Sequence, residues 1–257
     1  MATLFRTTGI ILSRRDHREA DRWYSAFTDG HGKVEFLARG GHKPLAKLTP
    51  HLEMPAEIDL LLVDGRQYFT VASTDRVRAF PNVYADAGKL TLVSGALHLV
   101  DIGTKPHETD PVLYDELTRF LAAVDEAPAL SAERSGFLLA AFGLKLLAII
   151  GYRPELANCL ACKDALCPGS YRWYAPKGGV VCDDCSTRDA SQWFAARPMK
   201  DETLKLIRFA LAERFEHQLR PHLPADTLEA FHEAVESLII SHFPTIPASS
   251  LREACIA

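Results

Sequence analysis

The sequence predicts a mixed α+β fold, in which a small β-barrel is followed by a helical domain. Three observations support this prediction. Short strand-like segments joined by tight turns fill residues 1–80, a helical pattern of apolar residues begins at Pro81, and five of the six cysteines lie between residues 158 and 186. The 257 residues are enough to bury a sizeable core in one large domain or two ordinary ones.

The first domain, residues 1–80, is expected to be a five-stranded barrel. The sequence DGHG at 29–32 and the Asp64-Gly65 pair are hairpin signals. In residues 33–39, apolar and charged residues alternate, as in a strand with one buried face. Five strands with two hairpins are typical of the oligonucleotide/oligosaccharide-binding (OB) barrel. The predicted strands are residues 4–13, 22–28, 33–39, 56–63 and 66–74.

The remainder, residues 81–257, is expected to be a helical domain. Apolar residues recur at a spacing of three to four, Ser131 is placed to cap a helix, and Gly151 stands where that helix ends. The apolar segment 137–151 is short for a bilayer crossing and contains Lys145, so we expect a buried helix in a cytoplasmic protein with no membrane contact. The predicted helices are residues 86–102, 110–126, 131–151, 199–219 and 225–242.

Four cysteines form two Cys-x-x-Cys pairs in a module predicted at residues 156–190. Nineteen residues separate Cys159 and Cys162 from Cys182 and Cys185, which is a spacing of four-cysteine zinc sites. In a cytoplasmic protein, paired cysteines are more often metal ligands than disulfides. We therefore predict one Zn²⁺ ion held by these four residues, and we leave Cys167 out of the ligand set because its four-residue separation from Cys162 makes a poorer knuckle.

The predicted zinc ion has a structural role. A catalytic zinc keeps one position open for water, which a zinc hydrolase would require, whereas four thiolates close the shell. The ion is expected to fold a module that is too small to bury its own core. Within this module, Tyr171 and Trp173 share one face of a predicted strand, and we expect them to form its core. The alternative is that they and Tyr174 form a surface on which bases stack.

A basic stretch follows the second predicted strand. Residues 33–51 hold Lys33, Arg39, Lys43 and Lys47 with one acidic residue. A basic loop beside a barrel is suited to follow a phosphate backbone with little demand for sequence; the alternative is an ordinary solvated loop. Aromatic residues of the barrel also offer rings for stacking, although we expect most of them in the core. These residues are Trp23, Tyr24, Phe36, Tyr68 and Phe69.

Charge is unevenly distributed along the chain. The net charge is −4, but residues 1–80 carry twelve Lys and Arg against ten acidic residues, and residues 81–257 carry seventeen against twenty-three. A polyanion is therefore expected to meet the first domain. The sequence has no ATP-binding loop, dinucleotide fingerprint, metalloprotease motif or serine-hydrolase motif, so we expect a protein without catalytic activity.

The chain resembles the RecO family of bacterial recombination mediators over nearly its whole length. The resemblance depends on three stretches: "EADRWYSAFTDGHGKVEFLARGGHK" at 19–43, "FGLKLLAIIGYRPELANCLAC" at 142–162 and "YAPKGGVVCDDC" at 174–185. The last two join an apolar helix, the sequence Gly-Tyr-x-Pro-Glu-Leu and the zinc knuckles in the order found in this family.

The resemblance implies an OB barrel followed by a helical domain with a four-cysteine zinc finger. It also implies binding of single-stranded and double-stranded DNA, annealing of complementary strands, and partnership with RecR. Together with RecR, members help to load RecA onto strands coated by single-stranded-DNA-binding protein (SSB), whose C-terminal tail binds the helical domain. DNA contacts of the family lie on the barrel and its basic loop. They map here to Arg14, Arg15, Lys33, Arg39, Lys43 and Lys47.

A second function remains open from the residues alone. The acidic helical part and the small number of basic residues in the loop also suit a zinc-stabilised adaptor that binds proteins and has little direct contact with DNA. Salt-dependent binding to single-stranded DNA distinguishes the mediator from the adaptor, because only phosphate contacts release counterions.

Overall fold

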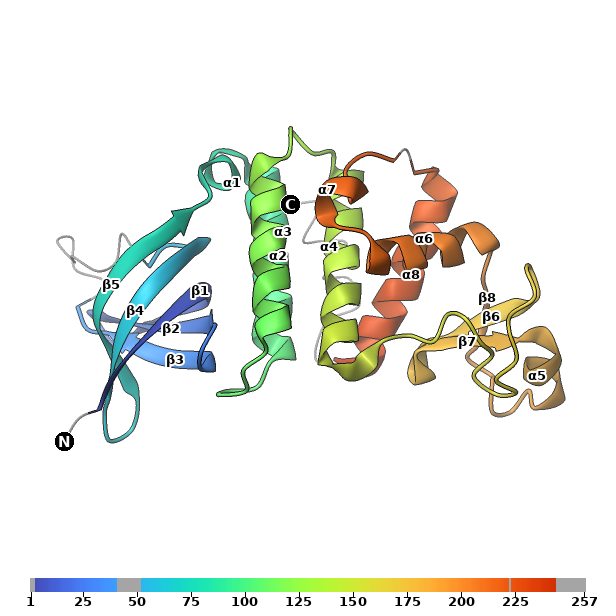
Figure 1. Ribbon diagram of the computed structural model, residues 1–257, viewed down its shortest axis with the longest axis horizontal. Coiled ribbons are helices and arrows are strands. Elements are labelled where there is room, and N and C mark those ends of the chain that lie inside the picture. Colours follow the sequence, from blue (N-terminus) through green and yellow to red (C-terminus); the bar gives the residue numbers. More distant parts are fainter. Residues whose placement is uncertain (1–2, 41–51, 222, 244–257) are drawn as a thin grey trace. The chain divides into compact units, whose positions relative to one another are not determined.

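The computed structural model describes residues 3–40, 52–221 and 223–243 of the chain. The chain divides into two compact units, residues 1–129 and 130–257. Among the described residues, the first unit contains a barrel and three helices, and the second contains the remaining helices and a small sheet. Figure 1 colours these elements along the sequence, from the blue barrel strands to the red last helix.

The barrel is closed and has five strands. β1 pairs in antiparallel fashion with both β2 and β4, while β3 and β5 close the barrel through a short parallel pairing. This architecture confirms the predicted fold class, and every predicted strand is present. The strands are β1 (Leu4–His17), β2 (Asp21–Thr28), β3 (Gly32–Ala38), β4 (Ala56–Asp64) and β5 (Phe69–Ala79).

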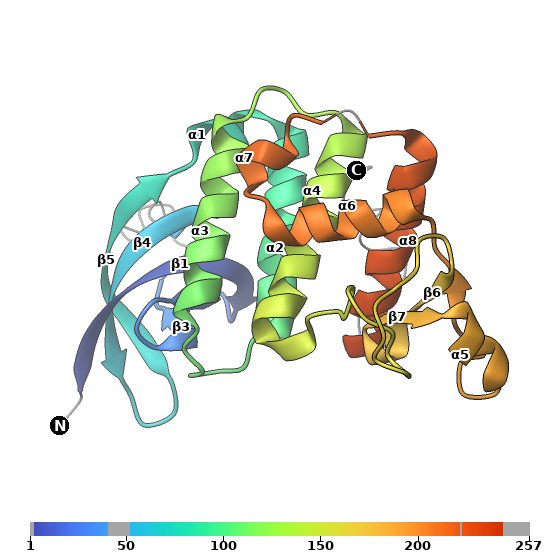
Figure 2. The same ribbon diagram turned by 45° about the vertical axis from the view of Figure 1, so that its right-hand side comes forward.

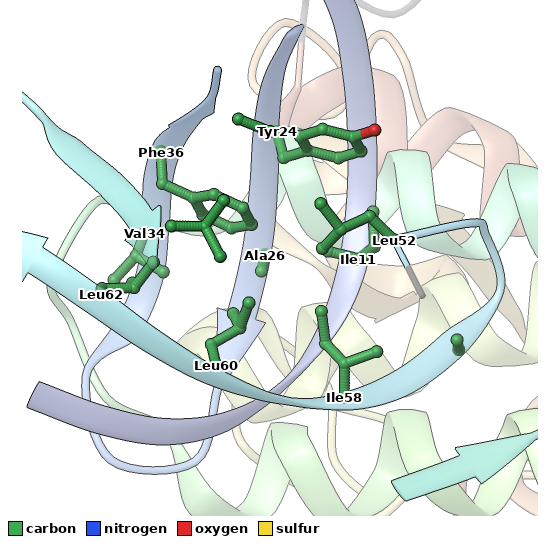
Figure 3. Packing of buried hydrophobic residues seen from close by; sticks show 12 residues of the cluster. Ile11, Tyr24, Ala26, Val34, Phe36, Leu52, Ile58, Leu60 and Leu62 are labelled. Atoms are coloured by element: carbon green, nitrogen blue, oxygen red, sulfur yellow. The ribbon is translucent and has the colours of Figure 1, made fainter. Parts of the chain in front are cut away.

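The interior of the barrel is a packed hydrophobic core. Along β4, Ile58, Leu60 and Leu62 are fully buried, while the residues between them are partly exposed. Figure 3 shows these side chains pointing into the same space as Tyr24 of β2 and Phe36 of β3. Burial of each such side chain stabilises the fold by about 1.5–3 kcal/mol. A ligand must therefore bind outside the barrel, because its interior is filled.

Both predicted hairpin turns are present, but the second is longer than predicted. Gly32, at the end of the first turn, has φ of +64°, and a Cβ atom there would lie 2.2 Å from the Glu108 carbonyl oxygen, so only glycine fits. In the second turn, the Gly65 N–H donates to the Tyr68 carbonyl at 3.2 Å, and β5 begins at Phe69 instead of residue 66. Tyr68 therefore lies in the loop and not in the strand.

Three helices complete the first unit, and two of them bind the barrel through polar contacts. The Ser25 hydroxyl on β2 donates to the Asp101 carboxylate at 2.9 Å, and the Tyr114 hydroxyl donates to the Glu57 carboxylate on β4 at 2.9 Å. These contacts join residues far apart in the sequence and fix the helices against the outside of the barrel. The helices are α1 (Pro81–Ala85), α2 (Ala87–Gly103) and α3 (Pro111–Glu126).

The helices of the second unit follow the prediction with one break. The segment predicted as a single helix over 199–219 forms two, because Glu213 adopts an extended conformation after α6. The Gln218 side chain then donates to the carbonyls of Ala210 and Glu213, at 3.0 and 2.9 Å, and so satisfies groups that the helix end leaves free. The helices are α4 (Ala132–Leu147), α6 (Asp201–Ala212), α7 (Phe215–Gln218) and α8 (Ala225–His242).

Helix α4 is the buried apolar helix that the sequence predicted. The Ser131 side chain caps its first turn, and η2 (Ala148–Tyr152) ends it at Gly151, whose φ is +100°. The segment Ala132–Tyr152 is long and apolar enough to cross a bilayer, but 67% of its apolar window is buried inside the structure. Its side chains are buried because α4 packs against α6 and α8, and Figure 2 shows these helices together.

The cysteine-rich module is built on a small three-stranded sheet. The predicted strand that carries Tyr171 and Trp173 is present as β6 (Tyr171–Tyr174). It is followed by η3 (Ala175–Lys177), β7 (Gly179–Cys182) and the short helix α5 (Asp183–Arg188). A third strand, β8 (Arg197–Pro198), pairs with β6 and lies beyond the module range of 156–190 given above.

Candidate metal centre and nucleic-acid face

Four cysteines of the second unit converge on one point. The β6–β7 hairpin places Cys182 at the end of β7, and Cys185 follows in the first turn of α5. Cys159 and Cys162 lie in a tight turn that is closed by the Lys163 N–H donating to the Cys159 carbonyl at 3.0 Å. The four sulfur atoms lie within 4.8 Å of one another. The structure therefore brings together the four residues that the sequence selected.

Backbone N–H groups favour negative charge on the Cys159 sulfur. The Cys159 sulfur accepts from the N–H groups of Ala161 and Cys182, each at 3.3 Å. Burial raises the pKa of Cys159, but the N–H groups of Cys182, Cys162 and Ala161 outweigh burial and lower that pKa to about 6. Burial raises the pKa of Cys182. Four thiols this close repel one another once ionised, so they need a cation to hold all of them as thiolates.

The four cysteine sulfurs suit a soft metal cation with tetrahedral coordination. Zinc–thiolate bonds of about 2.3 Å place the sulfurs of a tetrahedron about 3.8 Å apart, which is compatible with sulfurs that all lie within 4.8 Å of one another. Thiolate ligands select zinc or a comparably soft metal over calcium or magnesium. These four residues are thus able to hold a metal ion.

Cys167 lies beside this cluster but is not part of it. It is exposed and lines the same cavity as the four clustered cysteines. The group of sulfurs that lie within 4.8 Å of one another nevertheless contains only Cys159, Cys162, Cys182 and Cys185 among the described residues.

The aromatic residues of the module are buried, which supports their interpretation as core residues. Tyr171, Trp173 and Tyr174 are at most 7% exposed and present no ring for stacking. We expected from the sequence that Tyr171 and Trp173 would form the core of the module itself. They pack instead toward the neighbouring helices. The Tyr171 hydroxyl donates to Asp201 of α6 at 2.6 Å, and the Trp173 indole N–H donates to Ser237 of α8 at 3.0 Å. These two side chains anchor the module to the helices.

The core of the module depends on a residue that the sequence analysis missed. Trp193 packs with Tyr174, Val181 and two of the clustered cysteines, and its ring centroid lies 4.9 Å from that of Tyr174. The Lys177 ammonium lies 4.8 Å from the Trp193 ring centroid. The only sequence signal was a tryptophan shortly after the last cysteine pair, outside the predicted module.

The predicted DNA-binding residues differ in their surroundings. Arg14 and Arg15 are exposed on β1, and Arg39 is exposed directly after β3. The Arg15 guanidinium lies 3.6 Å from the Glu35 carboxylate, but 67% of its side chain remains accessible. Lys43 and Lys47 lie outside the described residues. Three exposed arginines thus remain as candidate phosphate contacts in the described part of the barrel.

Lys33 differs from these arginines because its charge is already engaged. Its ammonium donates to the Asp101 carbonyl and lies 3.6 Å from the Asp101 carboxylate. Only 14% of its side chain is exposed. Contact with a phosphate would require the loss of this ion pair.

Comparison with known proteins assigns both parts of the chain to one family. Residues 1–80 match the family described as "Recombination protein O N terminal", and residues 84–248 match "Recombination protein O C terminal". The chain is 26% identical over 248 residues to the DNA repair protein RecO of Alkaliphilus metalliredigens (strain QYMF), covering 96% of this chain and 97% of that protein. It is 30% identical over 199 residues to the DNA repair protein RecO of Rubrobacter xylanophilus, covering 76% and 77%.

These matches agree with the structure. The N-terminal match ends where the barrel ends, and the C-terminal match covers the helices from α2 to α8 and the four clustered cysteines. The chain belongs to the RecO family of DNA repair and recombination proteins.

Proposed function

We propose that this protein is a recombination mediator that binds single-stranded and double-stranded DNA and anneals complementary strands. With RecR, it helps to load RecA onto single strands coated by SSB, whose C-terminal tail binds the helical domain. The observation that supports this proposal most is the match of both parts of the chain to one recombination family. The division into a DNA-binding domain at 1–80 and a helical domain at 81–257 is part of the proposal.

Annealing by such a protein requires only that the repulsion between two DNA strands is reduced. Two DNA strands repel each other through their phosphates, and a positively charged surface lowers this repulsion while it leaves the bases free to pair. Arg14, Arg15 and Arg39 are exposed and supply this charge on the barrel, and Lys43 and Lys47, which lie outside the described residues, are further candidates. Lys33 instead supports the barrel through its contact with Asp101. No covalent bond is made or broken, so the protein is not an enzyme.

We propose that one zinc ion binds the four clustered cysteines and has a structural role. A bound zinc ion supplies a cross-link between the two cysteine pairs and offers no open position for a reacting water. The cross-link holds the β6–β7 hairpin, from which Tyr171 and Trp173 reach α6 and α8. X-ray absorption of the purified protein tests this role: four sulfur neighbours are expected, and an oxygen neighbour in place of a sulfur contradicts it.

Strand annealing tests the mediator most simply. Labelled complementary oligonucleotides are mixed with and without the protein, and the rate of duplex formation is measured. The mediator accelerates annealing at low salt, and the acceleration declines as salt screens the phosphate contacts. A rate equal to that in buffer overturns the proposal.

The zinc-stabilised adaptor is the second candidate function. It is favoured by the excess of acidic residues in 81–257 and by the ion pair that engages Lys33. An adaptor co-purifies with RecR and SSB, but its binding to single-stranded DNA is absent or independent of salt.

We expect the mediator in the cytoplasm, associated with the nucleoid.

A further inference from the structure

Three aromatic rings gather on the outer surface of the barrel. Trp23 of β2 contacts Tyr68 of the β4–β5 loop edge to face, with ring centroids 5.2 Å apart. His17 at the end of β1 lies 5.8 Å from Trp23, also at a steep angle. Trp23 points away from the interior because its neighbour Tyr24, which Figure 3 shows inside the barrel, is 1% exposed. We refer to His17, Trp23 and Tyr68 as the aromatic cluster.

The aromatic cluster differs from the other aromatic residues of the barrel. Tyr24 and Phe36 are at most 1% exposed, so no ligand reaches them without opening the core. Phe69 is half-buried, with its ring 5.2 Å from that of Phe5. Trp23 is partly accessible and Tyr68 is 36% exposed. Trp23 and Tyr68 are thus the two accessible rings among the five aromatic residues that the sequence offered for base stacking.

Positive charge lies beside these rings. The Arg15 guanidinium lies 5.8 Å from the Trp23 ring centroid, and Arg15 and Trp23 are register partners on β1 and β2. On the other side, Trp23 is the register partner of Leu37 on β3, and Arg39 follows Leu37 by two residues. Arg15 therefore lies beside Trp23 on β1, and Arg39 directly follows β3, the strand that pairs with the other edge of β2.

We propose that Trp23 and Tyr68 form a platform on which unpaired nucleobases stack, while Arg15 and Arg39 contact the flanking phosphates. Rings of this kind bind any base, because every base has a π-face, and a neighbouring guanidinium adds a cation–π contribution. Bases in a duplex are already stacked on one another and do not reach the platform. The inference rests on the proposed function and deepens it: the barrel recognises the bases of single strands as well as their phosphates.

The test compares two ligands that differ only in their bases. A labelled thymidine oligonucleotide and an abasic oligonucleotide of the same length carry equal phosphate charge. Each is titrated with the full-length protein, and the dissociation constants are measured by fluorescence anisotropy. We expect the thymidine ligand to bind about tenfold more tightly for each base that stacks.

Substitution by leucine measures how much the aromatic rings contribute to binding. Trp23→Leu together with Tyr68→Leu keeps an apolar side chain at each position but removes the π-face. The preference for thymidine over the abasic ligand is expected to fall close to one, and affinity for the abasic ligand is expected to stay unchanged. Tyr152→Leu is the control, because Tyr152 is an aromatic residue of the second unit that is 45% exposed; its variant keeps the full preference.

Intrinsic fluorescence provides a measurement that needs no altered protein. Of the three tryptophans, Trp173 and Trp193 are 4% and 5% exposed, so quenching by a stacked base reports on Trp23. Saturating thymidine oligonucleotide is expected to quench the emission, and the abasic ligand is not. Equal affinity for both ligands, or unquenched emission at saturation, overturns the platform and leaves DNA binding intact. Failure to bind either ligand overturns the proposed function itself.

Discussion

Removing positive charge from the barrel tests whether its exposed arginines contact phosphates. The perturbation is the triple substitution of Arg14, Arg15 and Arg39 by alanine. Each phosphate contact on a single strand contributes about 0.7 to the slope of log affinity against log salt. The loss of three contacts lowers the slope by about 2, so that between 50 and 200 mM salt the wild type loses about twentyfold more affinity than the variant.

The assay is fluorescence anisotropy of a labelled thymidine oligonucleotide at several salt concentrations. The matched control is the triple alanine substitution of Lys105, Arg119 and Lys200, whose side chains are 60–80% exposed outside the barrel. It removes the same net charge, so it separates local phosphate contacts from the general field of the protein. Equal slopes in the two variants, or an unchanged slope in the barrel variant, would refute the reasoning.

Three further predictions concern stability. Cys182→Ser should abolish stoichiometric metal binding and lower the free energy of unfolding of the second unit by about 4 kcal/mol or more, measured by metal analysis and urea denaturation. Gly169→Ala should lower stability by about 1–2 kcal/mol through its positive φ alone, and Gly32→Ala should lower it further, because a Cβ there meets backbone atoms. Two backbone N–H groups lower the pKa of Glu155 in the folded protein. The resulting stabilisation is complete above the unfolded pKa of about 4.3 and is lost as pH falls through the lower folded pKa. Glu155→Gln should therefore reduce the loss of stability in acid.

A specific result would contradict each of these predictions. Cys167→Ser is the control for the metal site and should retain the metal, so loss of metal from that variant would show that the ligand set is different. Equal effects of Gly32→Ala and Gly169→Ala would mean that the turn does not pack against its neighbour as described. An acid unfolding profile that Glu155→Gln leaves unchanged would contradict the role of the carboxylate.

Local sequence patterns predicted most of the fold. Strand alternation and turn residues identified the five strands, and the helical period gave the last helix with the same bounds that the structure shows, 225–242. The two Cys-x-x-Cys pairs identified the four sulfurs that converge. These features depend on neighbours in the sequence, which is why they are readable from it.

Features that depend on distant residues were not predictable. The ion pair of Lys33 involves Asp101, 68 residues away, so nothing in the sequence indicates that this charge has a partner within the protein. The break between α6 and α7 is supported by the Gln218 side chain, and periodicity alone does not reveal it. Tyr68 lies in a loop and not in a strand, because the β4–β5 connection is longer than the Asp64-Gly65 signal indicated.

We propose that DNA binds the outside of the barrel and that the cysteine module braces the second unit. Photo-crosslinking tests it directly: a single strand containing photoreactive thymidine analogues is bound to the full-length protein, irradiated, and the crosslinked peptides are identified by mass spectrometry. We expect crosslinks in peptides from residues 1–80, with Trp23 and Tyr68 among the modified residues. Crosslinks confined to the cysteine module, residues 156–190, and to β8 would contradict it.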